Sequence, residues 1–304
     1  MTRRIPIGVS DFEILRTGNF YYVDKTMLAA EVVRSGASTI LLPRPRRFGK
    51  TMNLSMLHRF FDMDGSGASL FDGLAVAGHA DVMAHCGQYP TVFLTFKDIK
   101  YSDYSSCYDA LGMALADVFR KHEQTILKAK PEYIEKQMVD AILRCEAKAV
   151  WLQSSLALLT RLLHRATGRR VIILLDDSDT PIHAGFHNYY DKEITGFMDN
   201  LLTGCFQDNS HLEKGVIAGA LQIAKRATFP GLDFDVHTIL NESFSSHFGF
   251  SEGEVSAMLD NTGQGGRLAD VRTWYKGYRF GSHTVYNPWS VIHDAAYPQN
   301  MLEA

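Results

Sequence analysis

The stretch RPRRFGKT at residues 44–51 contains the residue types that proteins use to bind phosphate groups. Gly49, Lys50 and Thr51 match the end of the motif G-x-x-x-x-G-K-S/T, in which backbone amides and the lysine hold phosphates while the hydroxyl binds magnesium. The first glycine of that motif is replaced here by Arg44. The three matching residues alone would also fit a solvated basic turn. An apolar run before them and a helical pattern after them favour a phosphate-binding loop.

A second, acidic motif supports the same chemistry. The uniformly apolar run VIILL at residues 171–175 ends in Asp176, where phosphate-loop enzymes place the acid that holds the magnesium shell. Asp177 follows, at the position where a glutamate usually polarises the attacking water. The alternative is that these acids only end a strand and begin a turn before Pro181. Two motifs in the expected order, each after a buried strand, favour a nucleotide site.

The pattern of apolar runs and helical segments predicts the elements that position both motifs. Uniform apolar runs indicate buried strands of a parallel sheet, and here they alternate with segments of helical periodicity. The predicted strands cover residues 38–42, 90–96, 170–177, 215–221 and 235–240, and the predicted helices cover 50–61, 189–206 and much of 104–165. This alternation predicts an α/β fold of the P-loop NTPase type, with a mostly parallel sheet and helices on both faces.

The two ends of the chain carry weaker signals. Residues 19–38 predict a short strand and then a helix with Asp24 at its N-cap. Near the other end, a capping-box pattern at Ser251 and Glu254 precedes a short helix, and the aromatic stretch 274–290 predicts a hairpin. We therefore expect two units, a P-loop domain over residues 1–250 and a small C-terminal helical and β-hairpin subdomain over residues 251–304.

The composition describes an ordinary globular protein and excludes several classes. The 304 residues are 46% hydrophobic and 21% charged, which is enough apolar material for a sizeable core. A net charge of −3 does not support a general nucleic-acid binder, which would be markedly basic. The four cysteines form no C-x-x-C pair, so neither a zinc site nor a disulfide framework is indicated. No apolar run is long enough for a signal peptide or a membrane span, and we expect a cytoplasmic protein without membrane contact.

Two other groups of residues could do chemistry, and both have a simpler interpretation. His183 and His187 would share one face of a helix as zinc ligands, but Pro181 and Gly185 predict a loop there and no third ligand is near in the sequence. A set of aromatic residues could form a stacking platform for single-stranded nucleic acid, although core packing is the commoner role. That set consists of Trp274, Tyr275, Tyr278, Phe280, Tyr286 and Trp289, with Lys276 and Arg279 among them.

Several motifs together resemble one known family. They are IPIGVSDFEILRTGNFYYVDKT, RPRRFGKT, LLDDSDTPI, ALQIAKRATFPGL, HFGFSEGEV and WYKGYRFG with VYNPWS. In this combination they resemble the bacterial AAA-ATPase-like family, whose members usually carry a PD-(D/E)XK nuclease-like domain at the C-terminus. The resemblance covers residues 5–291. The loop of that family reads R-P-R-R-F-G-K-S/T, so the missing glycine is a trait of the family.

The resemblance implies roles for the residues of the two motifs. Lys50 is expected to contact the outer phosphates of ATP, and Thr51 and Asp176 are expected to hold Mg²⁺. The triphosphate itself would be bound by Pro45, Arg46, Arg47, Phe48, Gly49, Lys50, Thr51 and Met52.

The chain also departs from the family pattern, mainly at positions tied to hydrolysis. The family reads D-E-Y-D at the acidic motif, so Asp177 replaces a glutamate and Ser178 a tyrosine. Gln222 stands where an arginine is usual after the fourth strand. Further departures are Arg226, Pro230 and Asp233. With Lys50, Asp177 and Gln222 as the catalytic positions, the pattern predicts that binding is retained while turnover is slowed.

Three functions remain open at this point. The first is a magnesium-dependent ATPase with slow hydrolysis. The second is a nucleotide-binding module that does not hydrolyse ATP and recruits a protein partner or a second copy of itself. The third is a component of nucleic-acid processing, suggested by the nuclease-like domain of the family. Because only fourteen residues follow Ser290, we expect no nuclease-like domain and no nuclease activity in this sequence, which could be cut from a longer protein.

Overall fold

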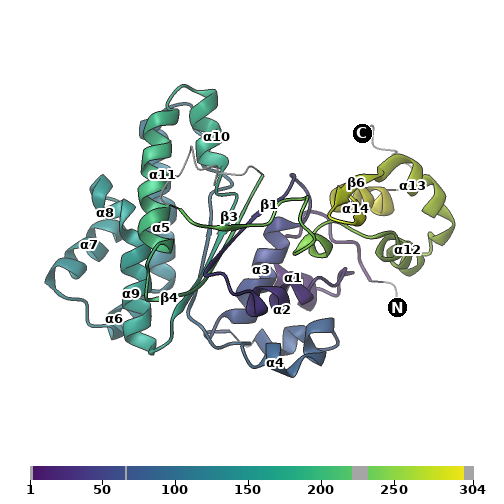
Figure 1. Cartoon of the computed structure of the whole chain (residues 1–304), viewed down its shortest axis with the longest axis horizontal. Coiled ribbons are helices and arrows are strands. Elements are labelled where there is room, and N and C mark those ends of the chain that lie inside the picture. The colour runs from purple at the N-terminus through teal and green to yellow at the C-terminus, as the bar shows by residue number, and fades with distance from the viewer. Residues whose placement is uncertain (1–2, 66, 221–231, 298–304) are drawn as a thin grey trace.

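A five-stranded sheet forms the centre of the computed structural model, which describes residues 3–65, 67–220 and 232–297 (Figure 1). Its strand order is β2 (Thr91–Thr95), β3 (Val171–Asp176), β4 (Leu212–Gly219), β1 (Thr39–Pro43) and β5 (Asp235–Val236). All neighbouring strands in this order are parallel. The predicted strands are confirmed, although β4 begins at Leu212 and β5 has only two residues. Because the strands are parallel, the loops after β1, β3 and β4 leave from the same edge.

Helices cover both faces of the sheet, as the sequence predicts. Along β3, Ile173 and Leu175 pack into one hydrophobic cluster while Ile172 and Leu174 pack into another, as expected for side chains that alternate between the faces of a strand. The first face is covered mainly by α5 (Tyr104–Lys121), α6 (Glu123–Lys128), α7 (Tyr133–Leu143), α8 (Ala149–Gln153), α9 (Ser155–Thr167), α10 (Thr180–His187) and α11 (Asp191–Phe206). The second is covered by α1 (Phe12–Thr17), α2 (Met27–Arg34), α3 (Lys50–Phe61) and α4 (Ala80–Met83), with the 3₁₀ turns Gly67–Phe71 and Ala75–Gly78.

The N-terminal prediction was right about the helix and wrong about its start. The N-cap of α2 is Thr26, and Asp24 instead accepts hydrogen bonds from the amide and the hydroxyl of Thr26 at 2.8 and 2.6 Å. The predicted short strand is reduced to an isolated bridge between Phe20 and Arg4. The other Asp24 oxygen accepts from the amide of Ala75, so this carboxylate holds together two segments and does not cap the helix.

The segment after β3 corrects a second prediction. Residues 180–187 form the helix α10 and not a loop. Pro181 is compatible with a helix because it lies in the first turn, where its missing amide hydrogen is not needed. Gly185 allows close packing, since a β-carbon there would lie 2.4 Å from Ile194 of α11. His183 and His187 therefore lie on one helix.

The C-terminal elements gather beside the N-terminal segment, at the right of Figure 1. They are α12 (Glu252–Asn261), α13 (Leu268–Tyr275), the antiparallel hairpin of β6 (Lys276–Phe280) and β7 (His283–Tyr286), and α14 (Pro288–Ala296). The capping box of Ser251 and Glu254 and the hairpin are confirmed. A third hydrophobic cluster unites these elements with Val23. In the described part of the chain no helix has the length and apolar character to cross a bilayer.

Candidate nucleotide-binding site

The loop between β1 and α3 contains two residues with a left-handed backbone. Gly49, directly before the first residue of α3, has φ 82°, and Arg47 has φ 69°. Glycine adopts this conformation without steric cost, whereas an arginine there is uncommon. The loop therefore turns sharply and delivers Lys50 and Thr51 to the first turn of α3. The backbone amides at that end are the donors that a helix leaves unpaired.

Arg44, at the position of the missing first glycine, points away from this turn. Its side chain is fully buried, and its guanidinium donates to the carbonyl oxygens of Pro43, His237 and Phe244. It also lies 4.8 Å from the ring centre of Phe248, a cation–π contact. Burial lowers the pKa of Arg44 to about 10. This arginine holds the loop to residues 237–248 and does not face the cavity.

Lys50 is also buried, but it faces the turn of its own loop. Its ammonium donates to the carbonyl oxygens of Arg44 and Pro45, each at 3.2 Å, and lies 4.0 Å from a carboxylate oxygen of Asp177. Burial lowers the pKa of Lys50, and the charge of Asp177 opposes that shift. The loop carbonyls and Asp177 thus hold a desolvated cation at the start of α3.

Thr51 and Asp176 join the two motifs directly. The Thr51 hydroxyl donates to Oδ2 of Asp176 at 2.7 Å. Asp176 is fully buried at the end of β3, and its Oδ1 has no hydrogen-bond partner among the described residues. Burial raises the pKa of Asp176 to about 6, although the hydrogen bond from Thr51 lowers it. A buried carboxylate with one unpaired oxygen beside a hydroxyl can serve as a ligand for a hard cation.

The residues after Asp176 lie close to the same place. Asp177 has a left-handed backbone with φ 48°, and its side chain is 31% exposed and directed toward Lys50. Ser178 is fully buried and donates to the carbonyl oxygen of Ala218 at 3.3 Å. Asp179 accepts from the amide of Ala220, which ties the segment after β3 to the end of β4.

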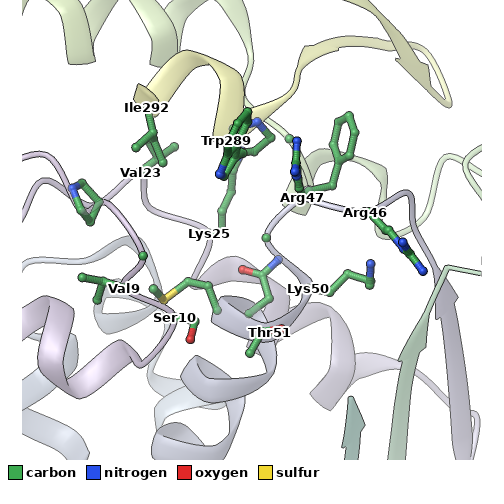
Figure 2. A pocket seen from close by; sticks show the side chains of 18 of the residues that line it. Val9, Ser10, Val23, Lys25, Arg46, Arg47, Lys50, Thr51, Trp289 and Ile292 are labelled. Atoms are coloured by element: carbon green, nitrogen blue, oxygen red, sulfur yellow. The ribbon is translucent and has the colours of Figure 1, made fainter. Parts of the chain in front are cut away.

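A cavity of about 540 Å³ opens beside these residues (Figure 2). Most of the predicted site residues line it, namely Arg46, Arg47, Phe48, Gly49, Lys50, Thr51, Met52 and Asp177. Pro45 and Asp176 are not part of the lining, and they meet it through Lys50 and Thr51. Gln222, Arg226 and Pro230 lie outside the described residues.

The cavity also has walls that the motifs did not predict. They include residues 6–10, 21–23 and 25 from the N-terminal segment, Lys97 and Lys100 after β2, and Trp289, Ile292 and His293 from α14. These segments carry no phosphate-binding or acidic motif. The signals in the sequence were the family resemblance of residues 5–26 and of 285–290 and the aromatic set that includes Trp289, none of which indicates that these residues line one cavity.

The aromatic set of residues 274–289 is divided among different surroundings. Tyr275, Phe280 and Tyr286 are buried, and Phe280 packs against Phe48 of the loop with ring centres 5.0 Å apart. Trp274 is 56% exposed, while Trp289 lies 4.0 Å from the guanidinium of Arg47. The three buried residues belong to hydrophobic clusters of the core, as the packing interpretation predicts.

Comparisons with known proteins identify the family. The family model described as "Predicted AAA-ATPase" matches residues 6–229, which include both motifs. The chain belongs to the AAA-ATPase-like family. It is also 26% identical over 292 residues to the "Uncharacterized protein in vnfD 5'region" of Azotobacter chroococcum mcd 1. That alignment covers 95% of this chain and 51% of the relative, so the chain spans about half the length of the relative it matches. No solved structure matches.

Proposed function

We propose that this protein binds ATP with Mg²⁺ at the loop of residues 44–51 and hydrolyses it slowly. The observation that carries the proposal is the meeting of the two motifs, in which Thr51 donates to Asp176 while Lys50 lies at the start of α3. Three features then converge on one point: a helix N-terminus, a buried ammonium and a buried carboxylate. Together they suit a phosphate group that is accompanied by a cation.

The residues present fit Mg²⁺, which prefers oxygen ligands and usually takes few of them from the protein. Thr51 would hold the ion through its hydroxyl, and the unpaired Oδ1 of Asp176 would accept from its water shell. No group of three or more acidic, histidine or cysteine side chains suited to a metal occurs in the described residues. Such a group is not needed where the phosphates of the nucleotide supply further ligands to the ion. Bound there, Mg²⁺ supplies positive charge to the outer phosphates.

Hydrolysis would depend on Asp177, which occupies the position of a glutamate in the family. Its carboxylate is shorter by one methylene and lies 4.0 Å from the Lys50 ammonium. In this role it would orient and deprotonate water for attack on the γ-phosphate. Since a group displaced by about 1 Å can cost on the order of 10²-fold in rate, turnover is expected to be slow. The replacement of the family's arginine by Gln222 would remove a further positive charge that stabilises the transition state.

The contact between Asp177 and Lys50 also favours a second candidate function. A carboxylate engaged with the loop lysine is not free to act as a base, so the protein would bind ATP without hydrolysing it. Such a module would act through the shape that it adopts with ATP, by recruiting a protein partner or a second copy. Phosphate release at steady state distinguishes the two functions.

Calorimetric titration with ATP, with and without Mg²⁺, tests the binding site. Replacing Lys50 with Ala should weaken ATP binding by about 10- to 100-fold, because charged hydrogen bonds to phosphate contribute roughly 1.5–3 kcal/mol. Lys214→Ala is a matched control, since Lys214 also donates to two carbonyl oxygens but lies outside the cavity. Equal affinity in parent protein and folded Lys50→Ala would refute the assignment.

A further inference from the structure

The turn after β2 places two lysines in the same cavity as the phosphate loop. Lys97 and Lys100 line this cavity together with Lys50 and Asp177. Both residues are exposed, and neither ammonium has a hydrogen-bond or ion-pair partner among the described residues. The phosphate-binding and acidic motifs do not account for these two cations.

The pairing of β2 with β3 brings this turn beside the acidic motif. Thr95, the last residue of β2, pairs with Asp176, and the amide of Phe96 donates to the carbonyl oxygen of Asp176 at 3.0 Å. Lys97 therefore leaves the sheet next to Asp177. In the strand order β2 and β1 lie on opposite sides of β3. The turn after β2 and the phosphate loop after β1 thus flank the acidic motif along the edge of the sheet.

The backbone of the turn is held by buried contacts. Phe96 and Ile99 belong to the first hydrophobic cluster, and the amide of Ile99 donates to the carbonyl oxygen of Phe96 at 3.0 Å. The carbonyl oxygen of Tyr101 accepts from the hydroxyl of Tyr190 at 2.7 Å. The backbone positions of the two lysines are therefore fixed, whereas their ammonium groups can turn toward a ligand.

The position of the turn indicates which phosphate these lysines could reach. In the proposed complex Lys50 and the start of α3 hold the triphosphate, and Asp177 orients water next to the γ-phosphate. Asp177 already has an ion pair with Lys50 at 4.0 Å, so its charge is met from the side of the loop. Cations that approach from the other side of Asp177 would meet the γ-phosphate before the two phosphates that ADP retains.

We propose that Lys97 and Lys100 contact the γ-phosphate of ATP and make the protein bind ATP more tightly than ADP. The inference rests on the proposed function, because it requires the triphosphate at the start of α3. An ammonium group offers three donors to phosphate oxygens, and its charge strengthens each hydrogen bond. The two lysines are then specificity-determining residues that distinguish a nucleoside triphosphate from a diphosphate.

Titration of the protein with ATP and with ADP, both with Mg²⁺, tests this assignment. The parent protein should bind ATP more tightly than ADP. Lys97→Ala and Lys100→Ala should each weaken ATP binding by about five- to tenfold and ADP binding by less than about twofold, since one charged contact from an exposed residue is lost. The double variant should lose most of the preference for ATP. Lys192→Ala is the control, because Lys192 is exposed on α11 and does not line the cavity.

The other outcomes would overturn the inference in distinguishable ways. If the parent protein binds both nucleotides equally well, or if the variants keep its ratio of affinities, the phosphate loop stands and the contact with the γ-phosphate fails. Equal weakening of ATP and ADP would mean that the lysines only balance the acidic motif. If the parent protein binds neither nucleotide, the proposed phosphate site fails and this inference fails with it. Because both lysines are exposed and unpaired among the described residues, the variants should keep the stability of the parent protein in urea.

Discussion

Two of the loops that reach the cavity hold their charged residues in different ways. The loop after β1 is held at three positions: Arg44 is bound to three carbonyl oxygens, Phe48 is buried, and Lys50 donates to carbonyls of the loop. In the segment after β3, Asp176 is buried and bound by a hydroxyl. Its neighbour Asp177 is one-third exposed and has a 4.0 Å ion pair with Lys50.

The difference separates binding from turnover. Phe48 and Lys50, two of the residues proposed to bind the triphosphate, are buried, and Lys50 is positioned by contacts that do not depend on a ligand. Asp177, which is proposed to orient water, is instead paired with Lys50. Preorganised groups contribute most to catalysis, so a poorly supported base should reduce rate more than affinity. The predictions below test this division.

The largest effect is expected from Asp177→Glu. The longer side chain should bring the carboxylate about 1 Å nearer to the γ-phosphate, and single-turnover hydrolysis should rise by up to about 10²-fold at similar ATP affinity. Asp177→Asn is the control of equal size, and it should hydrolyse more slowly than the parent protein. If the parent protein already turns over at about 1 s⁻¹ or faster, within the usual range of enzymes, Asp177 is not an impaired base.

Arg44→Met tests whether the two buried cations of the loop have separate tasks. It removes three charged hydrogen bonds and should lower the free energy of unfolding by roughly 2–4 kcal/mol, measured by urea denaturation. The ATP dissociation constant of the folded protein should change much less than in Lys50→Ala. An Arg44→Met protein of normal stability that has lost ATP binding would place Arg44 among the phosphate ligands.

Asp176→Asn should change the pH dependence of folding in the absence of Mg²⁺ and nucleotide. Burial raises the pKa of Asp176 to about 6, above its ordinary value of 3.8. The folded state therefore binds the proton of the Asp176 carboxyl group more strongly than the unfolded state does. The free energy of unfolding that this proton contributes is lost as the pH rises from about 4 to 6. Asparagine does not titrate and has no such loss. The free energy of unfolding of the variant should therefore exceed that of the parent protein by roughly 1–3 kcal/mol at pH 8 and equal it at pH 4. Parallel stability curves for the two proteins would contradict the raised pKa.

The sequence predicted the parts of the site that depend on local patterns. Uniform apolar runs identified the strands, and the G-K-T tripeptide located the start of α3. Pro181 and Gly185 misled the sequence analysis, because both residue types are typical of loops. Here Pro181 lies in the first turn of α10 and Gly185 packs against Ile194, a contact that the sequence does not reveal. The apolar part of the cavity lining could not be predicted from spacing, since residues 9 and 292 line the same cavity only because of the tertiary fold.

The smallest effect concerns Arg47, an exposed arginine of the loop that contacts α14. Its backbone conformation is left-handed and its guanidinium lies against Trp289. A cation–π contact at a partly exposed site contributes roughly 0.5–1 kcal/mol. Arg47→Ala should lower the free energy of unfolding by about that amount, and Trp289→Leu by more, because it also removes the ring contact with His293. The double variant should lose roughly 0.5–1 kcal/mol less than the sum of the two single losses, because the shared contact is removed only once.

A double-mutant cycle in urea measures this coupling, and the chain provides a control. Trp274 is 56% exposed on α13 and does not line the cavity, so Trp274→Leu combined with Arg47→Ala should give additive losses. If the Trp289 cycle is additive as well, Arg47 does not fasten α14 to the loop. The C-terminal elements would then be held by the hydrophobic cluster around Val23, by the packing of Phe280 on Phe48 and by the ion pair of Lys25 with Glu254. A coupling confined to Trp289 would instead make Arg47 the link through which the phosphate loop and α14 respond to one another.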